Sequence, residues 1–333
     1  MTGEPDSTAA GTIGTGHTIS VVSPVYGCRD SLMALVARVR TTFEESDLDW
    51  ELILVDDRGP DQPWDLIEEL AAADRRVRGV RLARNHGQHL AVWAGFEAAR
   101  GDYVAVIDCD LQDDPGVIPD LYRYVREQRA EAVVVDRGTW SDSRLRRFAS
   151  SCFYGLIHWL TGIRIKNYGN FGLYGRRMID TLLQFHEQEV FLPIMVSLTG
   201  YETVRFKVDR NERQQGESSY DILRLLRLAI AVVIRFSDRP LKLSVLIGGF
   251  FSGMAALVSV LLFVLWLAGS FTVEGWTSTI LSLWFIGGLI LATLGIHGFY
   301  LGRIFREVQR RPRIVVQETT ESEDRTHAAA KDL

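Results

Sequence analysis

Short apolar runs alternate with helical patterns between Thr18 and about Lys207. Five runs rich in Val and Ile predict strands, namely Ile19–Ser23, Glu51–Val55, Val77–Ala83, Tyr103–Ile107 and Glu131–Asp136. The segments between them have apolar residues at three- and four-residue spacing and predict the helices Asp30–Glu45, Pro63–Ala73, Gln88–Ala99 and Gly116–Gln128. This alternation predicts an α/β domain with a mainly parallel sheet and helices on both faces. In such sheets ligands bind at the carboxyl ends of the strands.

The pattern after the fifth run is less regular. Ser143–Leu160 predicts a helix that is rich in arginine at its start, Asn167–Tyr174 a strand, and Val190–Leu198 a buried helix. Asp221–Phe236 is strongly apolar with three interspersed arginines. Such a segment fits either an amphipathic helix in the membrane interface or a buried core helix, and the first is favoured because longer apolar segments follow at once.

Two apolar segments, Leu241–Gly269 and Ile280–Gly302, exceed the roughly 20 residues that cross a bilayer. The loop between them has no Lys or Arg, whereas several arginines flank their outer ends. The positive-inside rule therefore predicts a multi-pass protein of the cell (inner/plasma) membrane, with both termini and the preceding domain in the cytoplasm. Residues 1–17 do not resemble a signal peptide and predict a disordered lead, and the polar tail after Pro312 is also expected to be disordered.

Charge and cysteine content narrow the class of protein. A net charge of −5 argues against nucleic acid as a partner. The 3 cysteines (Cys28, Cys109 and Cys152) are widely spaced, so we expect neither a disulfide framework nor a zinc site, and a reducing compartment.

Two carboxylates, Asp108 and Asp110, come directly after the strand Tyr103–Ile107. Mg²⁺ or Mn²⁺ prefers one or two carboxylates and completes its shell with substrate phosphate oxygens. The diphosphate of a nucleotide-sugar supplies such oxygens, and the metal then stabilises the leaving group as a Lewis acid. Taken alone, the pair fits solvated turn carboxylates equally well.

Polar residues also follow two other predicted strands. Asp56 and Asp57 can accept hydrogen bonds from a ribose hydroxyl or a base N–H, and Arg84 and Asn85 begin a loop that can contact the nucleotide. His86 and His89, in the same loop, have a spacing that could bind a metal ion, but an H-x-x-H without nearby Cys or Glu is more often structural.

These motifs, in this order, resemble family 2 glycosyltransferases of GT-A fold, specifically the dolichyl- and polyprenyl-phosphate sugar synthases. The matching stretches are SVVSPVY (20–26), ELILVDD (51–57), RNHGQHLAVWAGFEAARGDYVAVIDCDLQDDP (84–115), NFGLYGRRMID (170–180) and RNERQQGESSY (210–220). The resemblance implies a GT-A (nucleotide-diphospho-sugar transferase) Rossmann-like catalytic domain over 18–220 and a juxtamembrane amphipathic helix over 221–240. It also implies a two-helix transmembrane hairpin (241–269 and 280–302) and a basic, then polar cytoplasmic tail over 303–333.

The resemblance also implies roles for single residues. Asp108 and Asp110 would handle metal and diphosphate, with Gln112 as an added metal contact. Asp56 and Asp57 would contact the nucleoside in a pocket shaped by Pro24 and Tyr26. The residues expected to hold the acceptor phosphate, or to close over donor and acceptor, are Arg137, Arg147, Arg210, Arg213, Ser218 and Ser219. For each of these arginines a surface salt bridge or a headgroup contact is the alternative.

The chain departs from the family pattern in three places. It has Gly27-Cys28 where many relatives have Asn-Glu, and Asp57-Arg58-Gly59 where many have Asp-Asp-Gly-Ser. Asn170 stands where some relatives have an acid.

The expected reaction is inverting transfer of a sugar from a nucleotide-sugar to a polyprenyl (undecaprenyl-type) phosphate at the cytoplasmic membrane face. The chain could also be a homo-oligomer. Transfer to a hydroxyl of a lipid-linked saccharide or glycolipid is the alternative, and a non-catalytic membrane adaptor is a second one. A hydroxyl nucleophile needs a general base, whereas a phosphate monoester is largely deprotonated at neutral pH.

Overall fold

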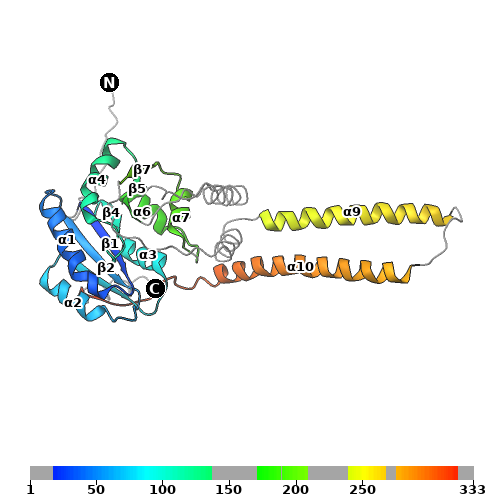
Figure 1. Ribbon diagram of the computed structural model, residues 1–333, viewed down its shortest axis with the longest axis horizontal. Coiled ribbons are helices and arrows are strands. Elements are labelled where there is room, and N and C mark those ends of the chain that lie inside the picture. The colour runs from blue at the N-terminus through cyan, green and yellow to red at the C-terminus, as the bar shows by residue number, and fades with distance from the viewer. Residues whose placement is uncertain (1–17, 137–170, 189, 209–238, 268–274, 322–333) are drawn as a thin grey trace, which may run out of the picture. The chain divides into compact units, whose positions relative to one another are not determined.

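A computed structural model of the protein describes residues 18–136, 171–188, 190–208, 239–267 and 275–321 (Figure 1). The predicted lead, the helix Ser143–Leu160 and the amphipathic segment Asp221–Phe236 lie outside these ranges. The chain forms two compact units. The first contains the described residues of 1–140, 166–211 and 312–333, and the second those of 141–165 and 212–311.

The first unit is built on an eight-stranded sheet of order β7-β5-β6-β4-β1-β2-β3-β8. The strands are β1 (Ile19–Val25), β2 (Trp50–Asp56), β3 (Val77–Leu82), β4 (Tyr103–Val106), β5 (Ala132–Asp136), β6 (Gly172–Gly175), β7 (Thr203–Lys207) and β8 (Val316–Thr319). Strands β4, β1, β2 and β3 are parallel neighbours, and β5 is parallel to β7. Strand β6 is antiparallel to β4 and β5, and β8 is antiparallel to β3. The predicted mainly parallel sheet is therefore confirmed.

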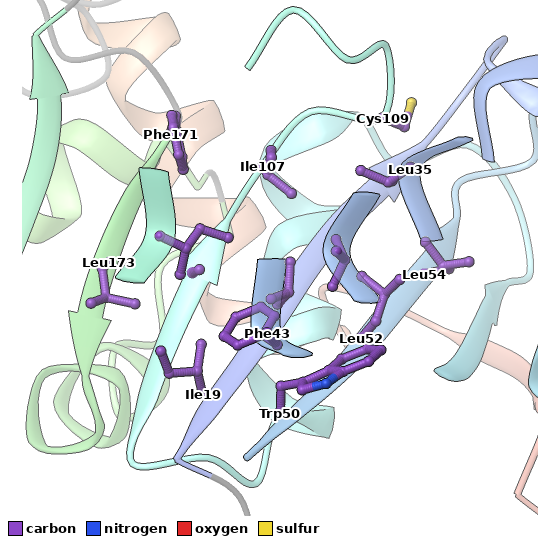
Figure 2. Packing of buried hydrophobic residues seen from close by; sticks show 14 of the residues in the cluster. Ile19, Leu35, Phe43, Trp50, Leu52, Leu54, Ile107, Cys109, Phe171 and Leu173 are labelled. Carbon is purple, nitrogen blue, oxygen red and sulfur yellow. The ribbon is translucent and has the colours of Figure 1, made fainter. Parts of the chain in front are cut away.

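Helices cover both faces of the sheet, as the sequence predicts. They are η1 (Arg29–Ser31), α1 (Leu32–Glu44), α2 (Trp64–Ala73), α3 (Gln88–Ala98), η2 (Pro115–Val117), α4 (Ile118–Glu127), α6 (Arg176–Leu183) and α7 (Leu192–Leu198). One core cluster joins α1, α2 and α4 to the sheet, and a second joins α3, α6 and α7 to it. Along β2, Leu52 and Leu54 enter the first cluster and Ile53 the second, because successive strand residues point to opposite faces. Figure 2 shows part of the first cluster, where Phe43 stacks on Trp50 at 5.7 Å between ring centroids.

The five predicted strands and four predicted helices of the N-terminal half are confirmed, with ends that move by one or two residues. The buried helix predicted at Val190–Leu198 is also present, as α7. The predicted strand Asn167–Tyr174 is found in part as β6, which begins at Gly172, and residues 167–170 of the prediction lie outside the described ranges. Helix α6 and strands β7 and β8 were not predicted.

A buried carboxylate, Glu51, links the starts of three central strands. Its Oε1 accepts hydrogen bonds from Ser20 Oγ at 2.6 Å and from the Arg100 backbone N–H at 2.7 Å, and its Oε2 accepts one from Arg78 Nη1 at 2.6 Å. Burial acts to raise the pKa of Glu51, but these hydrogen bonds outweigh it and the pKa lies below its usual value. The group is therefore ionised and fully paired at neutral pH.

The expectation of a disordered tail is wrong for residues 312–321. The Ala83 N–H donates to the Val315 carbonyl at 2.8 Å and the Thr320 N–H to the Gly79 carbonyl at 3.1 Å, so β8 extends the sheet beyond β3. Ile314 packs against the second core cluster, and the Arg313 guanidinium lies over the Trp93 ring at 4.9 Å. The strand was missed in the sequence because 4 residues are too few to show a two-residue period. Its pairing with β3 satisfies backbone groups that β3 would otherwise expose as an edge strand.

The second unit contains α9 (Arg239–Leu267) and α10 (Trp276–Val308), which run antiparallel side by side (Figure 1). Phe251 of α9 and Phe285 of α10 meet edge to face with ring centroids 6.0 Å apart. Among the described residues one segment, Ser282–Val308, is long and apolar enough to cross a membrane, with a mean hydropathy of 1.6. The apolar stretch Leu241–Ala255 is shorter than a span, so a hairpin with two spans stays a prediction.

Candidate active site

The described candidate residues gather at one edge of the sheet, where the parallel strands β4, β1, β2 and β3 end. They are Pro24, Tyr26, Asp56, Asp57, Arg84, Asn85, Asp108, Asp110 and Gln112. The other candidates, Arg137, Arg147, Asn170, Arg210, Arg213, Ser218 and Ser219, lie outside the described residues, so their roles stay predictions.

Asp57 holds the loop between β3 and α3. Its buried carboxylate accepts the His86 N–H at 2.7 Å on Oδ1 and the Gly87 N–H at 2.9 Å on Oδ2. Burial raises the pKa of Asp57, although these two hydrogen bonds act against the shift. Gly87 has a φ of 88°, a left-handed conformation that favours glycine. Asp57 thus shapes the loop that carries the exposed Arg84 and Asn85.

Asp56, also buried, holds the turn that follows β2. Its Oδ1 accepts the Arg58 N–H at 2.9 Å and the Gly59 N–H at 3.4 Å, and its Oδ2 lies 3.3 Å from Arg81 Nε. Burial raises the pKa of Asp56, with these two N–H groups and the arginine charges opposing it. Oδ2 faces the Arg81 guanidinium as an ion pair and accepts no hydrogen bond from the described residues.

Asp61 ties this turn to the loop after β1. It accepts the Gly27 N–H at 3.2 Å and the Arg29 N–H at 2.7 Å. A Cβ at Gly59 would lie 2.5 Å from Asp61 Oδ1 and 3.0 Å from the Gly27 nitrogen, so the close approach of the two loops requires glycine there. The hydrogen bonds of Asp61 thereby position the loop of Tyr26, whose side chain is exposed.

The loop after β4 presents the two aspartates. Gln88 Nε2 donates to Asp108 Oδ1 at 2.5 Å, and the Gln112 N–H donates to Asp110 Oδ1 at 3.0 Å. Asp108 is half-buried, whereas Asp110 and the Gln112 side chain are exposed. Leu111, between Asp110 and Gln112, has a left-handed φ of 60°.

Asp108, Asp110 and Gln112 fit a hard divalent cation that takes part of its ligand shell from the substrate. Their donor atoms are oxygens from two carboxylates and one amide. Among the described residues no group of three or more His, Cys, Asp or Glu side chains is placed to hold a metal. A cation there would therefore depend on diphosphate oxygens for the rest of its shell, as Mg²⁺ commonly does.

A disulfide between Cys28 and Cys109 joins the loops after β1 and β4, with Cα atoms 6.2 Å apart. The expectation of unpaired cysteines is wrong for these two, and Cys152 lies outside the described residues. The separation of 81 residues conceals a spatial proximity that follows from the parallel pairing of β1 with β4, where Val22 lies opposite Val106. Cys109 stands between Asp108 and Asp110, so the bridge fastens the aspartate loop to the loop of Tyr26.

We expect Cys28→Ser to lower the free energy of unfolding by about 2–4 kcal/mol, because the bridge restricts a long loop of the unfolded chain. Denaturant titration of the oxidised protein measures the change. Cys109→Ser and the double variant should lose the same amount as Cys28→Ser, and dithiothreitol should affect only the wild type. Additive losses, or a wild type that ignores the reductant, would contradict the pairing.

The two histidines of the β3–α3 loop are placed as structural groups. The His89 ring packs edge to face on Phe191 at 4.8 Å, and burial lowers its pKa. Burial and the neighbouring Arg84 charge lower the pKa of His86 as well. Both rings are therefore neutral at pH 7, and His86 serves the site through its backbone bond to Asp57.

Several residues that shape the site were not candidates in the sequence. They are Arg58, Asp61, Arg81, Gln88, Gln317 and Glu318. Gln88 could have been found, because it is the first residue of a predicted helix that begins at the ligand edge. Gln317 and Glu318 carry no comparable signal, since they lie more than 200 residues from their partners Arg58 and Arg81.

Comparison with known proteins identifies the family. Residues 20–185 match the description "Glycosyl transferase family 2". The undecaprenyl-phosphate 4-deoxy-4-formamido-L-arabinose transferase of Shewanella sediminis is 34% identical over 90% of this chain and 92% of its own length. The Proteus mirabilis protein of that name is 35% identical over 91% of this chain and 94% of its own length.

Among solved structures, the glucosyl-3-phosphoglycerate synthase of Mycobacterium tuberculosis in complex with UDP is 17% identical. The match covers 66% of this chain and 79% of that one, with a TM-score of 0.44. The family assignment does not depend on this weak likeness. The family match over most of the sheet domain and the near full-length relatives show that the chain belongs to family 2 of the glycosyltransferases, with a GT-A Rossmann-like α/β domain.

Proposed function

We propose that this glycosyltransferase moves a sugar from a nucleotide-sugar to a polyprenyl phosphate, with inversion at the anomeric carbon. The observation that carries the proposal is the placement of Asp108 and Asp110 after β4 at the same edge of the sheet as the Asp56–Asp57 turn after β2, with β1 between the two strands. Relatives that match nine-tenths of the chain are named as undecaprenyl-phosphate sugar transferases, which supports the acceptor.

The turn after β2 and the loop after β1 would bind the nucleoside. Asp56 Oδ2 can accept from a ribose hydroxyl or a base N–H, and Tyr26 lies on the neighbouring loop. Asp57 acts indirectly, because it holds the backbone at His86 and Gly87 and so presents Arg84 and Asn85 to the diphosphate. These contacts orient the donor, and orientation is a large part of the catalysis of such a reaction.

The aspartate loop would hold the diphosphate end of the donor. Asp108, Asp110 and the Gln112 side-chain oxygen would bind Mg²⁺ or Mn²⁺, which supplies Lewis-acid stabilisation of the leaving nucleoside diphosphate when bound. Gln88 fixes the Asp108 carboxylate through its 2.5 Å hydrogen bond. Arg137, Arg147, Arg210 and Arg213, with Ser218 and Ser219, would position the acceptor phosphate by charge-assisted hydrogen bonds.

Helices α9 and α10 would anchor the enzyme as a two-span hairpin with the catalytic domain in the cytoplasm. The apolar exposed segment Ser282–Val308 supports an anchor, and Arg303, Arg306, Arg310 and Arg311 at its carboxyl end support the orientation. A lipid-linked acceptor would then be in the same membrane as the enzyme.

Assay of the detergent-solubilised protein with a panel of nucleotide-sugars and two acceptors tests the proposal. The panel should include nucleotide-activated 4-deoxy-4-formamido-L-arabinose. We expect transfer to undecaprenyl phosphate and none to undecaprenol. The phosphate monoester can attack without a general base, whereas the alcohol needs a base to remove its proton. Activity should fall below about pH 6, because the acceptor phosphate dianion then takes up a proton.

Asn170 sharpens the choice between acceptors. If an acid at this position served as base, the amide would be harmful, so transfer to a hydroxyl would improve in Asn170→Asp. We expect Asn170→Asp to change the rate with undecaprenyl phosphate by no more than a few-fold. Transfer to an alcohol acceptor with lipid phosphate inert would overturn the proposal in favour of the hydroxyl reaction.

A further inference from the structure

Strand β8, which follows the last apolar helix, begins at the edge of the sheet where the candidate site residues gather. Strand β8 pairs antiparallel with β3, so its first residues lie beside the carboxyl end of β3, where the site residues gather, and its last residues lie toward the opposite edge. Glu318 lies opposite Arg81, and Val316 opposite Leu82.

Glu318 shares an arginine with Asp56. Arg81 Nη1 donates to Glu318 Oε1 at 2.5 Å, while Arg81 Nε lies 3.3 Å from Asp56 Oδ2, and the guanidinium packs over Trp64 at 5.5 Å from the ring centroid. Glu318 therefore engages one arm of the fork. Without this carboxylate the guanidinium can turn so that both its Nε and Nη1 groups donate to Asp56 Oδ2, which would take the acceptor position proposed for a nucleoside.

Gln317 holds the second arginine of the turn. Its Oε1 accepts a hydrogen bond from Arg58 Nη2, and Arg58 Nε donates to the Leu82 carbonyl at 3.0 Å. The Arg58 backbone, at a left-handed φ of 57°, donates its N–H to Asp56 Oδ1. Such a conformation is unfavourable for a side chain with a Cβ and persists when neighbouring contacts hold it. The two side-chain contacts of Arg58 meet this need.

We propose that Gln317 and Glu318 are positioning residues of the donor site, because they hold the two arginines that fix both oxygens of Asp56. The inference rests on the proposed role of Asp56 in nucleoside binding. It makes the segment after the last membrane-type helix a functional part of the catalytic domain, with an effect on donor affinity and none on the chemical step.

The segment directly after β8 offers a matched control. Glu321 also pairs with arginines, at 3.0 Å from Arg78 and 2.7 Å from Arg100. These contacts lie toward the amino-terminal end of β3, and Arg78 pairs there with Glu51 rather than with the site. A loss of tail attachment alone would affect Glu318 and Glu321 variants equally.

The full-length protein in detergent, with Mg²⁺, is titrated by calorimetry with UDP, GDP, CDP and ADP, and the tightest ligand is used thereafter. We expect Glu318→Gln and Gln317→Ala to raise its Kd, and the KM of the matching nucleotide-sugar, by about 5–10-fold, as loss of supporting contacts commonly does. The kcat should stay within about twofold, and Glu321→Gln should stay within about twofold of wild type in both constants.

A double-mutant cycle tests whether the effect passes through Asp56. In an Asp56→Asn background, Glu318→Gln should cause no further loss of affinity. Three outcomes would overturn the inference: equal effects of Glu318→Gln and Glu321→Gln, no effect of Glu318→Gln and Gln317→Ala, or full additivity with Asp56→Asn. In each case binding by the wild type would still uphold the proposed function. A wild type that binds none of the four diphosphates would refute the proposed function itself.

Discussion

Asp110→Asn is expected to reduce sugar transfer by at least about 10²–10³-fold, because one charged contact to a diphosphate or its metal is lost where charge develops in the transition state. The fold should remain intact, since Asp110 is exposed and its one hydrogen bond from the described residues comes from the Gln112 N–H. Initial rates with saturating Mg²⁺, together with thermal unfolding of the same samples, measure both effects.

Asp102→Asn provides the control for loss of one surface carboxylate. Asp102 is exposed at the start of β4, at the opposite end of the strand from Asp110. It should keep near-normal transfer. Near-normal transfer by Asp110→Asn would remove that residue from the mechanism, and an equal loss in both variants would point to net charge rather than to the site.

Glu51→Gln should lower the free energy of unfolding by about 3–5 kcal/mol, since it removes one partner from a buried ion pair. The Glu51 side chain is 0% exposed and that of its partner Arg78 is 13% exposed, so water cannot replace the lost charge. Denaturant titration followed by the fluorescence of the buried Trp50, Trp64 and Trp93 measures the change.

The effect should depend on pH in a defined direction. Because the pKa of Glu51 is lowered in the folded protein, its stabilisation is present above the unfolded-state pKa of about 4.3 and is lost as the pH falls through the folded pKa. The gap between wild type and Glu51→Gln should therefore narrow below about pH 4.3. Glu321→Gln, which removes the 43% exposed partner of the same arginine, should cost less than about 1 kcal/mol. Equal losses in the two variants would contradict the distinction between buried and exposed partners.

The central sheet was predictable because most residues of its strands are apolar. In β1 and β2 every residue is buried, and Val, Ile and Leu predominate although each strand also contains buried polar residues such as Ser20 and Glu51. The ligand edge followed from a general property of parallel sheets, which places Asp56, Asp57, Asp108 and Asp110 together without any knowledge of their contacts.

The roles of individual groups within that edge were less accessible. Asp57 appears in the sequence as a ligand residue, but its two oxygens accept backbone N–H groups of the next loop. The Cys28–Cys109 bridge and the β3–β8 pair join residues that are far apart along the chain, and no local period signals them. Contacts of this kind depend on which strands become neighbours, which a local pattern does not specify.

The position of β8 in the chain has a consequence for biosynthesis. Leu82, the last residue of β3, precedes Val316, the first of β8, by 234 positions, and α9 and α10 lie between them. At 5–20 residues per second, β3 therefore waits roughly 10–50 s on the translating ribosome before its partner is synthesised. During this interval the sheet has an open edge next to the buried residues Val80 and Leu82, a surface prone to pairing with other chains. Nascent chains that stall after α9 would keep this edge exposed, which makes them the form of the protein most prone to aggregation and to chaperone binding.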